Sequence, residues 1–446
     1  MRIGEIEEQI HILEPQSTAM TVLKNIIDSG VQEDAFYVLD VGEIVRQHKE
    51  WKMKLPRVEP FYAVKCNDHP ILLKVLAALG TGFDCASKGE MVKVLDMGVD
   101  PHRIIFANPA KMASQIRHAA SQGVDLMTFD NECELHKIKT LFPAARLVIR
   151  IRADAADPQC PLGMKFGCDA DADAPRLLEL AKTHGLNVCG VSFHVGSGCQ
   201  EPAAYMRAIA KARLIFDHAA KIGYNFTILD LGGGYLGNKD SSIDKMAEAI
   251  NCALDTHFPV CERVMVIAEP GRFYSAAAFT LATNIHSKRN CPSHTMYYIN
   301  DGVYGSFNCI LYDHAKVKPL AYPVGQRALP TKVEKCSIWG PTCDGLDQVM
   351  DAALLPPLDI GDWIIFEDMG AYTLPVASTF NGFPLPKVHA VISEPLWLLL
   401  KDRLPLSEDN FSMDTTPFWL SSWTQEEEEE ETTIPSLSSF LYDQLL

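Results

Sequence analysis

The sequence predicts a (β/α)8 barrel joined to a second, mostly antiparallel β domain, which is an α/β plus β fold. A chain of 446 residues is too long for one ordinary hydrophobic core. Short β-rich runs alternate with helical patterns eight times over roughly 230 residues, the count and length of such a barrel. After about residue 275 the long helical patterns stop while short β runs continue. We therefore expect the barrel over 36–275, the β domain over 1–35 and 276–402, and a mobile acidic tail over 403–446.

The barrel strands are predicted from apolar and β-branched runs at 61–66, 82–86, 103–108, 126–130, 146–152, 188–195, 227–231 and 264–269. Helical patterns fill the segments between them, at 70–79, 89–97, 111–123, 132–141, 173–184, 202–222 and 242–257. Asn131 stands where a helix should start. A doubly wound open sheet is the alternative, but eight evenly alternating units favour closure into a barrel.

The β domain is predicted from short runs at 297–299, 336–339, 363–366 and 388–392, which turns separate without long helical patterns. From about residue 402 the sequence turns to Ser, Thr, Pro and acids, including the unbroken acidic run from Glu426 to Glu431. Such a composition predicts a mobile tail. Its last residues, 440–446, are apolar enough to dock on another surface.

Composition and charge exclude several classes of protein. A formal net charge of −17 argues against nucleic acid or an anionic membrane as the main partner. The 13 cysteines form no CxxC pair and no Cys/His cluster at zinc spacing, so we expect reduced thiols and no metal site. The N-terminus has acids where a signal peptide needs a basic flank, and no apolar run is long enough to span a bilayer. We expect a cytoplasmic protein.

Lys65 ends the first predicted strand, in the apolar stretch 60–67. Burying an ammonium group without a partner is costly. One interpretation is that the amine reaches water at the end of the strand. The other is a reactive amine with a depressed pKa, ready to form a Schiff base. The residues on the other strands decide between them.

Polar residues and glycines gather near the ends of the other predicted strands, where a barrel of this kind places its reacting groups. They are Asp84, Arg150, His194 with Ser197 after it, Gly232, Gly233, Gly234, Glu269, Pro270, Gly271 and Arg272. Each one alone has an ordinary structural explanation. Together at one rim they indicate a site.

These residue types suit pyridoxal phosphate. Three consecutive glycines let backbone amides approach an anion, and beside Arg272 they indicate a phosphate site rather than a flexible turn. Glu269 then needs a cationic partner, which a protonated pyridine nitrogen supplies, and His194 is a candidate to stack on the ring. An amine at Lys65, a phosphate cradle and an acid for a ring nitrogen together describe this cofactor.

The motifs at 60–67, 83–88, 194–199, 230–234, 269–272, 301–314, 340–347 and 369–373 resemble those of the animal ornithine decarboxylases. That family, which includes the antizyme inhibitors, belongs to the alanine-racemase-like, fold type III group of pyridoxal phosphate enzymes. The resemblance runs from about residue 35 to residue 397. It implies a decarboxylase that converts L-ornithine to putrescine and CO2 in polyamine biosynthesis.

The resemblance also implies roles for residues of the β domain. Cys343 matches the family's proton donor, and Tyr372 matches a phosphate ligand. Tyr312, Asp313 and Asp344 match substrate contacts, the two carboxylates binding a distal amine. In the family, the residues that match Cys343 and Asp344 come from the partner subunit, so that two sites form only in a head-to-tail homodimer. Without the family, Cys343 is a small residue in a turn.

Two alternatives to an ornithine-specific enzyme stay open. Antizyme inhibitors keep the fold without catalysis, and the stretch 111–137 resembles the family's antizyme-facing segment, with Arg117 where a lysine is usual. One antizyme inhibitor lacks the acid found here at Asp84, which favours an active enzyme. The segments 286–294 and 384–390 and the tail depart from the family pattern, so a paralogue that acts on lysine or leucine is the second alternative. Two carboxylates facing an apolar side chain would be poorly solvated, which favours ornithine.

Overall fold

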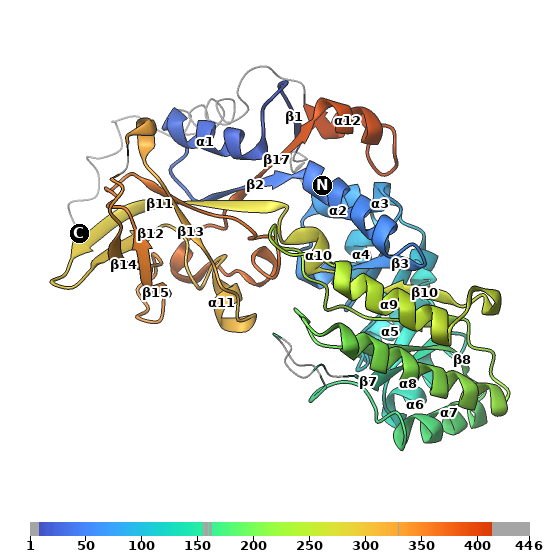
Figure 1. Cartoon of the computed structure of the whole chain (residues 1–446). Coiled ribbons are helices and arrows are strands. Elements are labelled where there is room, and N and C mark those ends of the chain that lie inside the picture. The colour runs from blue at the N-terminus through green and yellow to red at the C-terminus, as the bar shows by residue number, and fades with distance from the viewer. Residues whose placement is uncertain (1–8, 154, 156–158, 160–162, 329, 413–446) are drawn as a thin grey trace, which may run out of the picture.

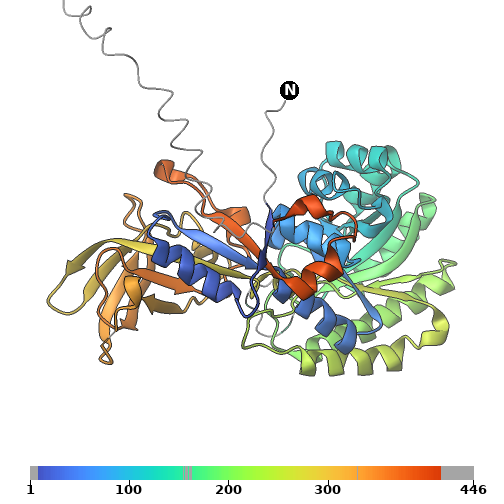
Figure 2. The same cartoon turned by 90° about the horizontal axis from the view of Figure 1, so that it is seen from above.

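The computed structural model describes residues 9–412 except 154, 156–158, 160–162 and 329, and its two domains lie side by side (Figure 1). Seen from above, the barrel and the β domain are again separate lobes (Figure 2). None of the described helices is long and apolar enough to cross a bilayer.

Eight parallel strands close into a barrel in the order β10-β3-β4-β5-β6-β7-β8-β9, which confirms the predicted closure. They are β3 (Val58–Ala63), β4 (Gly82–Cys85), β5 (Ile104–Phe106), β6 (Leu126–Phe129), β7 (Arg146–Arg152), β8 (Asn187–His194), β9 (Ile228–Asp230) and β10 (Met265–Ala268). Phe61, Ile105, Val148 and Ile267 come from four of these strands and pack into one buried cluster. Apolar residues therefore point into the barrel as well as outward, which explains the continuous apolar runs in the sequence.

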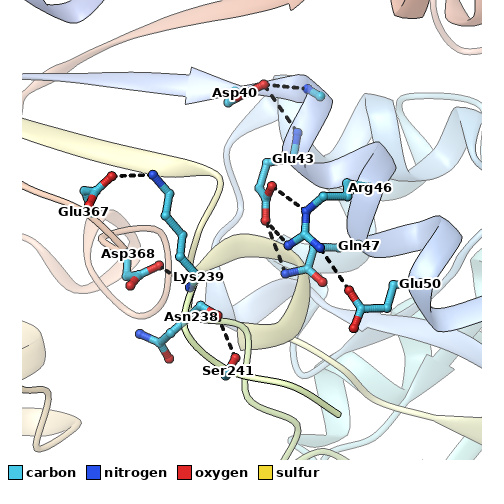
Figure 3. Close-up of polar contacts among 11 residues, drawn as sticks. Asp40, Glu43, Arg46, Gln47, Glu50, Asn238, Lys239, Ser241, Glu367 and Asp368 are labelled. Carbon is cyan, nitrogen blue, oxygen red and sulfur yellow. Dashed lines mark hydrogen bonds and ion pairs between the residues drawn. The ribbon is translucent and has the colours of Figure 1, made fainter. Parts of the chain in front are cut away.

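Helices connect successive strands around the barrel: α3 (Pro70–Ala78), α4 (Lys88–Leu95), α5 (Ala113–Gln122), α6 (Glu132–Leu141), α7 (Asp173–Thr183), α8 (Pro202–Lys221) and α9 (Asp244–His257). Asn131 caps α6 as predicted, since its side chain accepts a hydrogen bond from the amide of Glu134 at 3.0 Å. An earlier helix, α2 (Val41–Lys54), precedes β3. Its cap is Asp40, whose Oδ1 accepts from the amide of Gly42 at 2.8 Å (Figure 3).

The β domain is one sheet of ten strands. They are β1 (Ile10–Leu13), β2 (Phe36–Asp40), β11 (Phe279–Asn290), β12 (Thr295–Ile299), β13 (Pro319–Tyr322), β14 (Glu334–Trp339), β15 (Gln348–Leu355), β16 (Trp363–Phe366), β17 (Lys387–Ser393) and β18 (Phe411–Ser412). Five of the nine strand pairings recorded among the described residues are antiparallel and four are parallel. Short helices border the sheet: α1 (Ala19–Ser29), α11 (Asn308–Tyr312) and α12 (Glu394–Leu400).

Segments far apart in the sequence complete this sheet. β2 pairs with β11 and β17, so the chain passes through the β domain before α2 begins the barrel. The tail that we expected from residue 403 is structured as far as Ser412, because β18 pairs with β1. The acidic run 426–431 and the apolar end 440–446 lie outside the described residues.

Polar contacts fix the two domains against each other (Figure 3). Lys239, in the connection after β9, forms an ion pair with Glu367, which follows β16. The backbone amide of Lys239 also donates to Oδ1 of Asp368 at 3.0 Å. Deeper in the junction, Nδ2 of Asn67 donates to the carbonyl of Gly370 at 2.9 Å. The β domain is therefore held at the rim where the barrel strands end.

Candidate active site

Lys65 lies in a single 3-10 turn, η1 (Val64–Cys66), directly after β3. Its ammonium group forms an ion pair with the fully buried carboxylate of Asp84 on the neighbouring strand β4. Burial lowers the pKa of Lys65, but the carboxylates of Asp84 and Glu269 outweigh burial, and the net shift is upward. The expectation of a depressed pKa is therefore wrong for this structure, because the amine keeps its anionic neighbours.

Glu269 follows β10 and is buried near two further carboxylates, Asp230 at the end of β9 and Asp84. Burial raises the pKa of Glu269 well above its ordinary value, and the negative charges of Asp230 and Asp84 raise it further. The cations Lys65 and Arg150 act in the opposite direction without reversing the shift. The cluster thus holds more carboxyl groups than cationic side chains, and an added cation beside Glu269 would be stabilised.

His194 is the last residue of β8, where the strand register pairs it with Arg152 of β7, and Arg150 lies two residues earlier on that strand. Burial lowers the pKa of His194 well below its ordinary value, and the positive charges of Arg150 and Lys65 lower it further. Its Nδ1 accepts a hydrogen bond from the amide of Gly196 at 3.0 Å, which leaves the ring proton on Nε2. A neutral imidazole in a fixed orientation is suited to lie against a flat ring.

The three consecutive glycines make a turn that has no room for side chains. Gly232 and Gly234 have φ of +63° and +121°, a region that residues with a Cβ rarely adopt. A Cβ on Gly233 would lie 2.8 Å from Nε2 of His194. Oδ1 of Asp230 accepts from the amide of Gly232 at 2.9 Å, and burial raises the pKa of Asp230 to about 6. The backbone of this turn carries no side chains, so its amides can contact a neighbouring group directly.

Arg272 begins the short helix α10 (Arg272–Ser275), directly after the Glu269 segment. Its Nη1 and Nη2 donate to the two carboxylate oxygens of Asp313 at 2.7 and 2.8 Å. Nη2 also donates to Oγ of Ser197 at 2.9 Å, and the ring of Tyr372 lies 5.1 Å from the guanidinium carbon. The buried Nε has no partner among the described residues.

Backbone contacts join these groups into one unit. The amide of Ala63 donates to the carbonyl of Pro270 at 3.2 Å, and the amide of Tyr372 donates to the carbonyl of Cys66 at 2.9 Å. Tyr372 has φ of +55°, a strained value for a residue with a Cβ. A Cβ on Gly271 would lie 2.8 Å from Cβ of Cys66. The lysine turn, the glutamate and Tyr372 are thus positioned together.

A cavity of about 860 Å³ opens at this rim, between the barrel and the β domain. Its lining includes Gly198, Arg272, Cys309, Ala371 and Thr373, but not Lys65, Glu269 or the three glycines, so the cavity meets the cluster described above at Arg272. This volume lies within the range of small-molecule and cofactor sites.

Three of the predicted substrate-side residues are not brought to Lys65. Tyr312 ends α11 and is 70% exposed. Cys343 and Asp344 lie in the turn between β14 and β15, and Cys343 is exposed. Their recorded contacts are to other residues of the β domain, so that one chain does not bring Cys343 and Asp344 to the lysine turn.

Sequence reasoning missed two buried residues of the site, Asp230 and Asn67. Asp230 precedes the glycine turn, and Asn67 ends the lysine motif, where Oδ1 accepts from the amide of His69 at 3.0 Å. The available signal was a polar residue at the end of a buried strand for Asp230, and one after the turn that follows a buried strand for Asn67. Only their spatial contacts show what they position.

The residues present fit pyridoxal phosphate. Burial and the carboxylates of Asp230 and Asp84 raise the pKa of Glu269, and a pyridinium nitrogen beside it would stabilise the charged form. The glycine turn carries no side chains, so its backbone amides can approach an anion, and Nε of Arg272 is a buried donor without a partner among the described residues. An anion such as a phosphate group would satisfy both.

Comparison with known proteins agrees with this geometry. Residues 41–276 match the family model of the pyridoxal-dependent decarboxylases, pyridoxal binding domain. Ornithine decarboxylase of Mus pahari is 48% identical over 415 residues, which cover 89% of each chain. Antizyme inhibitor 2 of Xenopus laevis is 47% identical over 410 residues, covering 88% of this chain and 89% of that one.

The same relationship is seen in three dimensions. The crystal structure of the Paramecium bursaria Chlorella virus arginine decarboxylase bound to agmatine superposes with a TM-score of 0.79 at 38% identity, and covers 83% of this chain and 99% of that one. The range matched by the binding-domain model, residues 41–276, spans the lysine turn, the glycine turn and Glu269. The chain belongs to the pyridoxal-dependent decarboxylases, and pyridoxal phosphate is its cofactor.

Proposed function

We propose that the protein decarboxylates L-ornithine to putrescine and CO2, in polyamine biosynthesis. The observation that carries this proposal is 48% identity to ornithine decarboxylase over 89% of the chain, with the cofactor-side residues gathered at one rim. Arginine decarboxylase and lysine/ornithine decarboxylase structures are also similar to this chain, and their named substrates are basic amino acids. A basic amino acid is therefore the substrate class with most support.

Bound pyridoxal phosphate supplies an electron sink for the charge left when the α-carboxylate departs. Lys65 is the amine proposed to hold the cofactor covalently until the substrate amine replaces it. Arg272, Ser197, the three glycines and Tyr372 are the proposed phosphate contacts. Asp84 keeps the Lys65 amine in place, since the two side chains already form an ion pair.

Glu269 is proposed to hold a proton at the pyridine nitrogen. The carboxylates of Asp230 and Asp84 disfavour ionisation of Glu269. A cation beside Glu269 would offset this repulsion and stabilise its charged form. His194 is proposed to lie against the ring as a neutral imidazole, with Arg150 on the neighbouring strand. This arrangement is electrostatic stabilisation of the charge that develops during decarboxylation.

Cys343 is proposed to donate the proton that replaces CO2 on the α carbon, and Asp344 to bind the distal amine. Because the recorded contacts of Cys343 and Asp344 lie within the β domain, we propose that a second subunit supplies them in a head-to-tail homodimer. Mixing two inactive variants, Lys65→Ala and Cys343→Ala, then restores about a quarter of the wild-type activity, because half of the dimers regain one of two sites. No recovery on mixing would argue for sites within one chain.

The first test is CO2 release by purified protein with pyridoxal phosphate, given ornithine, lysine, arginine and leucine separately. We expect ornithine turnover, and none in the Lys65→Ala control. Turnover of lysine or leucine in place of ornithine would leave the decarboxylase intact and overturn the proposed substrate.

A second candidate function, regulation by antizyme binding, is favoured by the 47% identity to antizyme inhibitor 2. The stretch 111–137 spans α5 and α6, and it exposes Arg117 on the first of these helices. The side chain of Lys111 is instead fully buried, so it is not available to a partner. Co-purification with antizyme, weakened by Arg117→Glu, is the expected result if this surface binds. A catalytically inactive wild type that still binds antizyme would make regulation the main function.

We propose a cytoplasmic location. The support is a set of twelve described cysteines that are all free thiols, as in proteins of reducing compartments. Fractionation of cells that express a tagged chain tests this.

A further inference from the structure

The carbonyl oxygens of the glycine turn, 232–234, are all held by hydrogen bonds. Those of the first and third glycines accept from the backbone amides of Glu269 and Cys199, at 2.8 and 2.9 Å. The carbonyl of Gly233, between them, accepts from the hydroxyl of Tyr205 at 2.9 Å. Tyr205 is therefore the one of these three donors whose contribution depends on the identity of its side chain.

These contacts decide where the amides of the turn point. In a trans peptide unit, the carbonyl and the N–H of the next residue point in opposite directions. A carbonyl held on one side of the turn therefore directs the next amide to the other side. Among the described residues, no hydrogen bond is recorded for the amides of Gly233, Gly234 and Tyr235, although Gly233 and Tyr235 are buried. Buried donors need an acceptor, and adjacent backbone amides suit the oxygens of a phosphate group.

Tyr205 is fixed in place by the packing around it. It lies in the first turn of α8 and is fully buried. Its ring packs against those of Phe193 and Tyr235, with centroids 6.4 and 5.3 Å away. Burial raises the pKa of Tyr205 well above its ordinary value, so the phenol keeps its proton and remains a donor.

We propose that Tyr205 is a positioning residue of the cofactor site: its hydroxyl holds the carbonyl of Gly233 and thereby turns the amide of Gly234 toward the cofactor phosphate. This inference rests on the proposed phosphate contacts of the glycine turn. It adds to them a side chain from α8 that acts through the backbone of the turn.

The test compares pyridoxal phosphate with pyridoxal, which lacks the phosphate group. Each is titrated into the cofactor-free full chain, and its Kd is read from the absorbance of the bound form. Tyr205→Phe keeps the buried ring and loses the hydroxyl. Its Kd for pyridoxal phosphate rises about threefold or more, while its Kd for pyridoxal changes by less than about twofold. A rise that is equal for both ligands, or no rise at all, overturns the inference.

The matched control is Tyr224→Phe. The hydroxyl of Tyr224 also donates to a backbone carbonyl, that of Leu186 at 3.1 Å, just before β8 begins and so at the opposite end of the barrel. This variant loses the same kind of hydrogen bond, and both of its Kd values stay within about twofold of the wild type. A phosphate-specific loss of affinity in this control would overturn the inference, because the loss would not depend on the glycine turn.

Rescue provides a second measurement. With para-aminophenylalanine in place of Tyr205, a hydrogen-bond donor returns to the same position on the ring. We expect the Kd for pyridoxal phosphate to return to within about twofold of the wild type. A folded rescue variant whose Kd stays as high as that of Tyr205→Phe overturns the inference.

The titration uses no substrate, so a protein that does not turn over ornithine loses the proposed substrate and leaves this result unaffected. Gly233→Ala separates the remaining cases. If Gly233→Ala and Tyr205→Phe both leave the Kd for pyridoxal phosphate unchanged, the turn is not at the phosphate and the inference fails with that contact. If Gly233→Ala alone weakens binding, the turn stays at the cofactor and the role of Tyr205 is overturned.

Discussion

The buried charge cluster of Lys111, Glu134 and Lys137 provides a quantitative test of how this barrel is stabilised. Glu134 is in ion-pair contact with both lysines, at 2.9 Å from Nζ of Lys111 and 2.6 Å from Nζ of Lys137. The side chain of Lys111 is fully buried, whereas that of Lys137 is 37% exposed. Burial lowers the pKa of Lys111 from 10.5 to about 8, and Glu134 limits the fall. The Glu134 carboxylate is thus the main group that keeps the buried Lys111 amine charged.

Replacing Glu134 by leucine removes the charged partner of a fully buried ammonium group and leaves it the carbonyls of Asn108 and Thr128 as acceptors. Such a loss costs about 3–5 kcal/mol of unfolding free energy at pH 7. The pKa shift of Lys111 gives a similar scale, since a fall from 10.5 to about 8 is worth about 3 kcal/mol even with the carboxylate present. Lys111→Met costs less, about 1–2 kcal/mol, because Glu134 keeps Lys137.

The pH dependence of stability follows from the same pKa shift of Lys111. The pKa of Lys111 is lower in the folded than in the unfolded chain, so the penalty for burying its charge is present below pH 8. As pH rises from about 8 to 10.5, the folded protein releases a proton that the unfolded chain keeps, and the Lys111 contribution to stability rises. In Glu134→Leu this rise begins at lower pH, because the carboxylate that raised the pKa is gone.

Urea unfolding followed by far-UV circular dichroism, at pH 7 and pH 9.5, measures both effects. The matched control is Glu132→Leu, since Glu132 lies on the same helix and makes an exposed ion pair with Arg176. Because both side chains are exposed to solvent, that pair should contribute little to stability. A loss below 1 kcal/mol in Glu134→Leu, or no gain in its stability between the two pH values, would refute the reasoning.

Two further predictions concern the site. Gly233→Ala forces a methyl group against the His194 ring, so the Kd for pyridoxal phosphate, measured by absorbance titration, rises about tenfold or more. The control Gly89→Ala, where the nearest atom is 3.7 Å away, leaves this Kd unchanged. Wild-type affinity in Gly233→Ala would show that this turn is not near the cofactor. Asp347 accepts from the amide and hydroxyl of Thr342 at 2.9 and 2.7 Å, and so anchors the turn that carries the proposed proton donor. Asp347→Asn should lower kcat at least tenfold without a matching change in the Kd for pyridoxal phosphate, and equal changes in both would contradict a role confined to that turn.

The sequence by itself determined the barrel and the set of residues at its rim. Strand and helix periodicities are local, and eight alternating units leave closure as the simplest way to bury both faces of every strand. The same regularity places the end of each strand, so Lys65, His194 and Glu269 could be predicted to lie at one rim before any distance was known.

Tertiary structure alone decided the electrostatics. The direction of the Lys65 pKa shift depends on Asp84 and Glu269, which come from other strands. The pairing of Arg272 with Asp313 joins two domains, and nothing in either local sequence indicates it. Charge–charge interactions depend on distance and burial, not on position in the chain, and for that reason the sequence predicts which charged residues gather but not which of them remain charged and available.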